Sequence, residues 1–110
     1  MSYLSKKDQE RAMFLWYEER VRILSERTFK NNFFEQRELR GKGYELDHKL
    51  SIKDGYDLEV PPEIMADTAN LRLVPFMVNR SKASRSIVTY EELLEEISER
   101  DDFRDDYLVT

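Results

Sequence analysis

Two short stretches of the chain, residues 44–48 and 70–75, alternate apolar and polar side chains. Alternation with a period of two is typical of β-strands, because successive side chains of a strand point to opposite faces of a sheet. Pro75 closes the second stretch, and proline suits the end of a strand. The other segments have helical spacing or turn composition. The sequence therefore predicts an α+β fold with a small pair of strands set among helices.

The N-terminal part of the chain has the pattern of a long amphipathic helix. No Gly or Pro occurs between residues 7 and 27, and Met13 and Trp16 recur at helical spacing with further apolar residues. We expect this stripe to pack in the core rather than to stack on bases. Residues 28–39 predict a second helix or helical turn, which the two glycines of residues 40–43 end. Residues 1–40 thus form an N-terminal helical region.

The segment between the two strands is predicted to be structured. Residues 53–56 have turn composition, and residues 60–66 suit a short helix with proline in its first turn. After the second strand, residues 76–84 have helical composition. The order of elements in the middle of the chain is therefore strand, short linker elements, strand and helix.

The C-terminal quarter begins with the pattern of a capping box. The Thr89 hydroxyl and the Glu92 carboxylate can each bond a free amide at the start of a helix. We expect an acidic helix over residues 89–100 with Leu93 on its buried side. Residues 101–110 are expected to form a frayed acidic tail, because charge runs near a chain end rarely dock.

Length and hydropathy bound the protein class. A chain of 110 residues suffices for one domain and is too short for two, so residues 1–110 are expected to form a single domain. No apolar run approaches the ~20 residues that a membrane helix requires, and the start of the chain lacks the apolar stretch of a signal peptide. We therefore expect a cytoplasmic location and no membrane partner.

The net charge of −5 is unevenly distributed along the chain. Residues 86–110 carry 2 basic and 9 acidic side chains, so the excess of acid lies at the C-terminal end. Within residues 72–85, by contrast, every charged side chain is basic: Arg72, Arg80, Lys82 and Arg85. A local basic face can therefore exist on an acidic chain, and the net charge does not exclude nucleic acid as a partner.

Cysteine is absent from the chain, and His48 is its single histidine. This composition excludes disulfides, cysteine-based zinc sites and centres built from several histidines. No structural zinc is expected. A metal ion would have to be held mainly by oxygen atoms, which are the ligands that Mg²⁺ and Mn²⁺ prefer.

Three motifs in this order resemble the HNH endonuclease family. Glu45-Leu46-Asp47-His48 resembles its first motif, Asn70-Leu71 its central Asn, and Asn79-Arg80-Ser81-Lys82 its final motif. The resemblance is closest to small phage-encoded HNH-like proteins. It implies a ββα-metal core over residues 44–85, in which two antiparallel strands and a helix place His48 and Asn79 in one cleft. A long N-terminal helix and an acidic C-terminal helix would flank this core.

The resemblance also implies a role for each motif residue. The reactive centre would consist of Asp47, His48 and Asn70: His48 is the candidate general base, because its ordinary pKa near ~6.5 lets it take a proton at neutral pH. Asp47 and Asn79 would bind Mg²⁺ or Mn²⁺, and Asn70 would hold the loop between the strands. Asn79 stands where many family members have a histidine ligand, which makes this a His-Asn-Asn variant of the motif.

Basic side chains near the final motif are the candidates for nucleic-acid binding. Lys82 and Arg80 would clamp the phosphate. Arg72 and Arg85 are weaker candidates, since isolated arginines are commonly solvated surface residues. The family's paired cysteine zinc staples are missing from this chain, so packing of the flanking helices must replace them.

Two functions from different classes follow. The first is a Mg²⁺-dependent endonuclease that cuts DNA and leaves 5′-phosphate ends, with RNA left open as a substrate, and with a homodimer expected if both strands are cut. If the protein is phage-encoded, it would act in the host cytoplasm. The alternative is a catalytically silent protein that keeps the HNH scaffold and acts as a phage binding or regulatory factor on nucleic acid or on a host protein.

Overall fold

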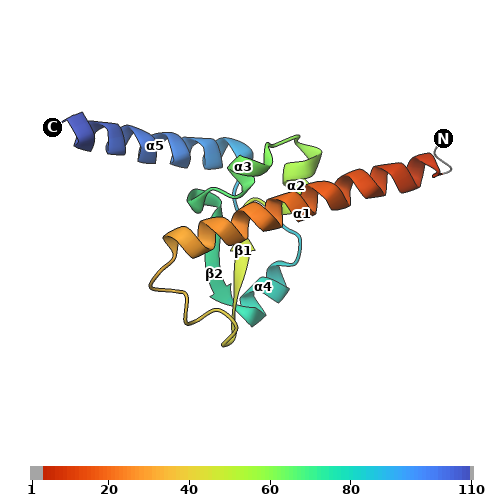
Figure 1. The fold of residues 1–110 in the computed structure, drawn as a ribbon, viewed down its shortest axis with the longest axis horizontal. Coiled ribbons are helices and arrows are strands. Elements are labelled where there is room, and N and C mark those ends of the chain that lie inside the picture. Colours follow the sequence, from red (N-terminus) through yellow and green to blue (C-terminus); the bar gives the residue numbers. More distant parts are fainter. Residues whose placement is uncertain (1–3, 110) are drawn as a thin grey trace.

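A computed structural model describes residues 4–109 of the chain, with side chains described up to residue 102. The fold is α+β (Figure 1). Helices precede, separate and follow the two strands of its single described sheet along the chain. The elements, in chain order, are α1 (Lys6–Asn32), β1 (Tyr44–His48), α2 (Ile52–Asp57), α3 (Pro62–Met65), the 3-10 turn η1 (Thr68–Asn70), β2 (Leu71–Pro75), α4 (Phe76–Lys82) and α5 (Tyr90–Val109).

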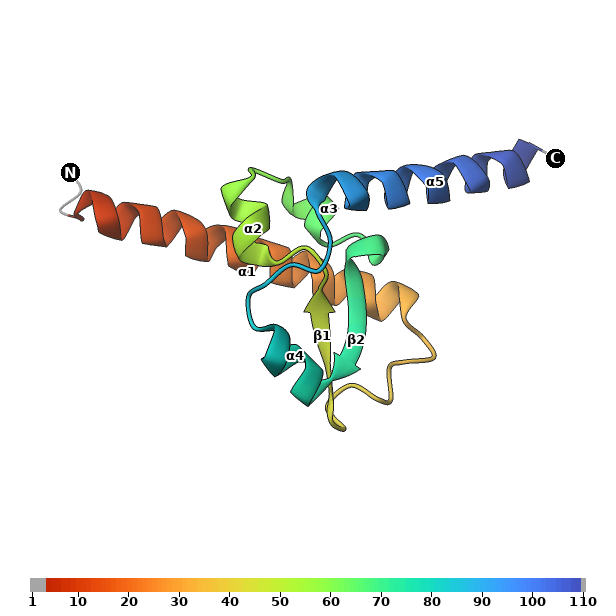
Figure 2. The same cartoon turned by 180° about the vertical axis from the view of Figure 1, so that it is seen from behind.

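The two predicted strands form an antiparallel hairpin, which confirms the α+β expectation. Tyr44 pairs with Pro75 at one end of the ladder, and Asp47 pairs with Arg72 near the other. Pro75 ends β2 and precedes the first residue of α4, so the chain passes directly from the second strand into that helix. Figure 2 shows α4 beside the hairpin, and α1 passing behind the strands.

Helix α1 is longer than predicted and absorbs part of the expected second helix. The Ser5 side chain caps its start by accepting a hydrogen bond from the Asp8 backbone amide at 3.1 Å, and the helix continues to Asn32. Turns follow instead of a second helix. Gly41 and Gly43 have φ of +84° and +88°, a left-handed conformation that glycine adopts more readily than other residues. They therefore form the turn into β1 rather than end a helix.

One stripe of α1 packs against the rest of the protein. Its buried residues are Tyr17, Val21, Ser25 and Phe29, spaced four apart, and the Tyr17 hydroxyl donates a 2.7 Å hydrogen bond to the Val60 carbonyl. The core also contains Leu50, Ile52, Met65, Ala69 and Leu93.

The prediction that Met13 and Trp16 pack in the core is wrong. Met13 is 62% and Trp16 is 67% exposed. Met13 stands four residues before Tyr17 and continues the buried stripe, and both residues line a cavity with Tyr17 and Tyr56. They are exposed because the N-terminal part of α1 extends beyond the sheet (Figure 1), where fewer elements are available to cover it.

The segment after β1 also differs from its prediction, because residues 53–56 lie within helix α2 rather than a turn. The Ser51 hydroxyl caps this helix by accepting a hydrogen bond from the Asp54 amide at 3.1 Å. A Cβ on Gly55 would lie 2.5 Å from the Met65 sulfur, so this glycine allows two short helices to approach closely. Its sequence signal is that of a turn, but its role is packing.

Helix α5 begins at the predicted capping box and ends later than predicted. The Glu92 amide donates to the Thr89 hydroxyl at 3.1 Å, and the Thr89 amide donates to the Glu92 carboxylate at the same distance. The helix continues to Val109 instead of ending at Arg100, since residues 101–109 contain no Gly or Pro to break it. Whether the acidic side chains beyond residue 102 dock lies outside the described side chains.

Two ion pairs and one core residue attach α5 to the hairpin region. Leu93 is fully buried, the Lys49 ammonium lies 3.1 Å from the Glu96 carboxylate, and the Arg100 guanidinium lies 2.6 Å from the Asp67 carboxylate. The remainder of α5 projects away from the body of the protein (Figures 1 and 2). No helix in the described part of the chain has an apolar stretch that could cross a bilayer.

Candidate active site

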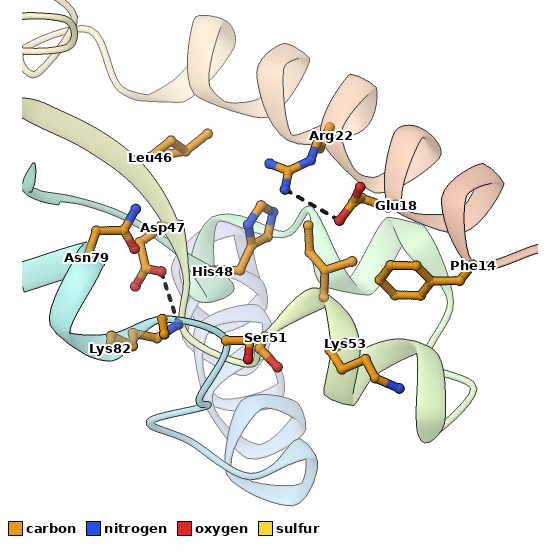
Figure 3. Close-up of a pocket in the computed structure, with 13 residues that line it drawn as sticks. Phe14, Glu18, Arg22, Leu46, Asp47, His48, Ser51, Lys53, Asn79 and Lys82 are labelled. Carbon is orange, nitrogen blue, oxygen red and sulfur yellow. Dashed lines mark ion pairs between the residues drawn. The ribbon is translucent and has the colours of Figure 1, made fainter. Parts of the chain in front are cut away.

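A cavity of about 460 Å³ lies where α1, β1 and α4 meet (Figure 3). Three elements supply most of its polar lining: α1 provides Glu18 and Arg22, β1 provides Asp47 and His48, and α4 provides Asn79 and Lys82. His48 and Asn79 therefore share one cleft, as predicted. The hairpin register, together with the direct passage from β2 into α4, brings the first and last motifs together.

Asp47 is held between two cations inside this cavity. Its side chain is only 5% exposed; one carboxylate oxygen accepts a hydrogen bond from Arg72 Nε at 2.8 Å, and the other lies 3.1 Å from Lys82 Nζ. Arg72 is the cross-strand partner of Asp47, and Lys82 comes from the last turn of α4. Lys82 is also buried, so removing either charge would leave the other buried without this partner.

His48 is oriented by a serine from the N-terminal helix. Its Nε2 lies 2.8 Å from the Ser25 hydroxyl, and both side chains are buried. The hydroxyl can donate to Nε2 or accept from it, and no hydrogen bond to Nδ1 is found among the described residues. Ser25 therefore fixes the ring while Nδ1 remains for another partner.

Burial and, to a smaller extent, the positive charge of Arg22 lower the pKa of His48 to about 4, against the opposing effect of the Asp47 carboxylate. The imidazole is consequently neutral at pH 7, which is the form that accepts a proton. A general base must be in this neutral form before it accepts a proton.

The depressed pKa of His48 predicts a loss of stability in mild acid. The unfolded chain has an ordinary histidine pKa near ~6.5 and binds a proton before the folded protein does, so stability should fall as the pH drops from about 6.5 to about 4. Between pH 7 and pH 5 this histidine should reduce the free energy of unfolding by about 2 kcal/mol. Urea unfolding at a series of pH values, in the presence of chelator, measures this change in the free energy of unfolding. The pH slope should be shallower in His48→Gln, and an identical slope in both proteins would contradict the assignment.

Asn70 lies behind the cavity and does not line it. Its side chain is fully buried: Oδ1 accepts a 2.7 Å hydrogen bond from the Leu50 amide, and Nδ2 donates to the carbonyls of Met65 at 2.9 Å and Leu50 at 3.3 Å. These bonds connect the start of β2 to the chain just after His48. The geometry agrees with the loop-holding role expected of Asn70.

Asn79 is oriented by a second acidic side chain of β1. Its Nδ2 donates a 2.8 Å hydrogen bond to the Glu45 carboxylate, which leaves Oδ1 as the remaining acceptor of the amide. Figure 3 places this amide next to the Asp47 carboxylate. Glu45 therefore selects which end of Asn79 is available as a ligand.

Two oxygen ligands from the protein, Asp47 and Asn79, are compatible with a hard divalent cation if water and substrate phosphate complete its ligand shell. Within the described residues, no three His, Cys, Asp or Glu side chains form a metal cluster. Mg²⁺ is nevertheless commonly held by one or two protein oxygens plus water and substrate phosphate, and Asp47 and the Asn79 Oδ1 atom would supply those oxygens. Binding would require the Asp47 carboxylate to exchange part of its contact with Arg72 and Lys82.

The predicted basic residues are not gathered at the cavity. Lys82 lines it, whereas Arg72, Arg80 and Arg85 do not. Arg80 stacks on the Phe76 ring at 4.2 Å, and Arg85 donates to the Ser81 carbonyl at 2.8 Å at the end of α4. A role for these three arginines in nucleic-acid binding stays a prediction.

Residues of α1 and the amino end of β1 were missed by sequence reasoning. Ser25 orients His48, Arg22 faces the cavity, and Glu45 orients Asn79. One signal was present: Ser25 is the polar member of an otherwise aromatic and aliphatic stripe that contains Tyr17, Val21 and Phe29. A small polar side chain in a buried stripe requires a hydrogen-bond partner, which could have marked it.

Comparison of the chain with models of protein families, with curated proteins and with solved structures finds no match. The functional inference therefore rests on the motifs and on the geometry of the cavity.

Proposed function

We propose that the protein is a divalent-metal-dependent endonuclease of the HNH type that hydrolyses phosphodiester bonds of DNA. The observation that carries this proposal is the convergence of Asp47, His48, Asn79 and Lys82 on one cavity at the junction of β1 and α4. These side chains supply a proton acceptor, two oxygen ligands and a cation, which are the groups that phosphodiester hydrolysis requires. In this proposal the hairpin and α4 form a ββα-metal core.

Each residue then has one task in the reaction. A bound Mg²⁺ or Mn²⁺ supplies shielding of charge on the phosphate and on the departing oxygen. His48 accepts a proton through Nδ1 from the water that attacks phosphorus, while Ser25 keeps its Nε2 atom in place. The phosphorus–O3′ bond breaks, which leaves a 5′-phosphate on one fragment and a 3′-oxygen on the other that takes up a proton from water. Asp47 and Asn79 would hold the metal ion, and Lys82, whose ammonium lies 3.1 Å from the Asp47 carboxylate, would contact the phosphate.

Supercoiled plasmid DNA provides the direct test of this function. Purified protein is incubated with plasmid in Mg²⁺, in Mn²⁺ and in chelator, and the relaxed and linear products are separated on a gel. Cleavage in metal and none in chelator is expected. If no divalent ion supports cleavage of plasmid, single-stranded DNA or RNA, the endonuclease proposal fails.

Metal binding is expected to be weak in the free protein and stronger with DNA. Arg72 and Lys82 hold both oxygens of Asp47, and DNA phosphate must complete the ligand shell. Calorimetric titration of Mn²⁺ into His48→Ala protein, with and without a DNA duplex, measures the difference. Adding Asp47→Asn should remove the DNA-dependent binding, whereas Asp57→Asn, which alters an exposed ion pair with Lys53, should retain it. Equal binding by both variants would exclude Asp47 as a ligand.

The alternative function, a catalytically silent scaffold protein that binds a partner, is favoured by two observations. Both oxygens of Asp47 are already engaged by cations. In addition, exposed Met13 and Trp16 line an apolar cavity of about 340 Å³ with Tyr56, and exposed apolar surface of this kind is typical of interaction sites. The plasmid experiment separates the two functions, because only the endonuclease requires turnover.

A further inference from the structure

A second cavity of about 610 Å³ adjoins the candidate active site. Arg22, Leu46 and Asn79 line both cavities, so the two spaces meet at these side chains. The second cavity continues from there between α1 and the loop that leads to β1, where Arg37, Arg40 and Tyr44 line it. We call this space, lined by Arg22, Phe29, Arg37, Arg40, Gly41, Tyr44, Glu45, Leu46 and Asn79, the arginine groove.

The arginine groove is basic in a protein that carries a net charge of −5. Three arginines and one carboxylate, Glu45, line it. The hydrogen bond from the neutral Asn79 amide leaves the charge of Glu45 in place, so the lining carries three positive charges against one negative charge. A nucleic acid that enters the candidate active site would carry phosphate charges, and positive side chains beside that cavity would attract them.

Two of these arginines are available to a ligand. The Arg37 side chain is exposed, donates to the Lys30 carbonyl at 2.8 Å and has no ion pair with a carboxylate among the described residues. The Arg22 side chain is 62% exposed, and its contact with Glu18 is loose at 3.6 Å. Solvent-exposed contacts of this kind are weak, so both guanidinium groups can turn to a phosphate with little loss.

Arg40 differs because it is already fixed in place. Its guanidinium binds both oxygens of Glu26 and stacks on the Phe29 ring at 4.9 Å. These contacts hold the loop against the end of α1 and form a wall of the groove. Arg40 therefore shapes the groove, while Arg22 and Arg37 supply the free charge.

We propose that the arginine groove binds the DNA strand that flanks the cleaved phosphate, with Arg22 and Arg37 contacting successive parts of its phosphate backbone. This inference rests on the proposed endonuclease function and extends it with a path for the substrate. Arg22, Leu46 and Asn79 line both cavities, so a strand whose phosphate lies at Asp47 and Asn79 can pass these side chains into the groove. The path uses α1 and the following loop, which lie outside the motif residues.

DNA binding without turnover tests this path. Fluorescence anisotropy with a short labelled DNA duplex is measured in chelator, in a His48→Ala background, over a series of salt concentrations. Arg37→Ala and Arg22→Ala should each weaken binding by about 3- to 10-fold, and each should reduce the slope of log affinity against log salt by about 0.9. Arg37→Lys keeps the charge and should recover the slope.

Arg27→Ala is the matched control, because this exposed arginine of α1 lines neither cavity. It should bind DNA like the parent protein. If Arg22→Ala and Arg37→Ala also bind like the parent, the groove proposal is overturned. Thermal unfolding of each variant checks the fold. If Arg22→Ala is unstable, Arg37→Ala decides alone, because this exposed side chain contacts only the Lys30 carbonyl and the Phe34 ring among the described residues.

Failure of the groove proposal can be told apart from failure of the endonuclease proposal. Cleavage by wild-type protein combined with normal DNA affinity of both arginine variants overturns only the groove. Absence of cleavage combined with arginine-dependent binding overturns the endonuclease and leaves the groove as a DNA-binding surface.

Discussion

Replacing His48 by Ala is expected to slow DNA cleavage by ~10²–10⁴-fold, which is the usual contribution of a general base. The imidazole is neutral at pH 7, because burial lowers its pKa to about 4. No other histidine in the chain can take over this task. Rates of plasmid relaxation at saturating metal, with the DNA affinity measured separately, isolate the chemical step.

A second variant guards this test against an effect on folding. His48 is buried, and its removal leaves the Ser25 hydroxyl without its partner, at a cost of ~1–3 kcal/mol. His48→Gln keeps a polar group near the position of Nε2 but cannot act as a base. It should remain folded by circular dichroism and be as inactive as His48→Ala. A folded His48→Gln protein that cuts DNA at the wild-type rate would show that His48 is not the base.

Replacing Asn70 by Ala is expected to lower the free energy of unfolding by about 3–4 kcal/mol, among the largest effects of a single substitution. The change leaves the Leu50 amide and the carbonyls of Leu50 and Met65 without the bonds that Asn70 now makes, in a fully buried place. Urea unfolding measures this loss of free energy, and the dependence of the free energy on urea concentration should be the same in both proteins. The exposed Asn31→Ala substitution on α1 is the control and should change stability by less than ~0.5 kcal/mol.

An isosteric variant separates the lost hydrogen bonds from the lost volume. Asn70→Asp keeps the size of the side chain and an acceptor for the Leu50 amide, but turns a carboxylate toward two carbonyls. It should therefore also be strongly destabilised. If Asn70→Asp is as stable as the wild type, the donors of Asn70 do not hold the loop, and its assigned role is wrong.

The sequence by itself determined the elements that depend on short-range patterns. Alternation of side chains located both strands, and the Thr89–Glu92 pair located the start of α5. Pro75 marked the boundary between β2 and α4, because proline cannot continue the ladder. The cavity shared by His48 and Asn79 was implied by the resemblance of the three motifs to the HNH family, not by any single pattern.

Only the tertiary structure decided which distant side chains complete the cavity. The bonds of Ser25 to His48 and the approach of Arg22 depend on how α1 crosses the hairpin, and no local pattern encodes that crossing. The same crossing leaves Trp16 exposed, although its spacing is that of a core residue.

Close approach and charge pairing were likewise decided in three dimensions. Gly55 has the composition signal of a turn, yet its lack of a side chain serves the contact of α2 with Met65. Arg72 and Lys82 have the composition signal of a phosphate-binding patch, yet both pair with Asp47. A local pattern reports the conformation that a segment prefers, whereas the partner of a buried polar group is set by whatever the fold brings within hydrogen-bonding distance.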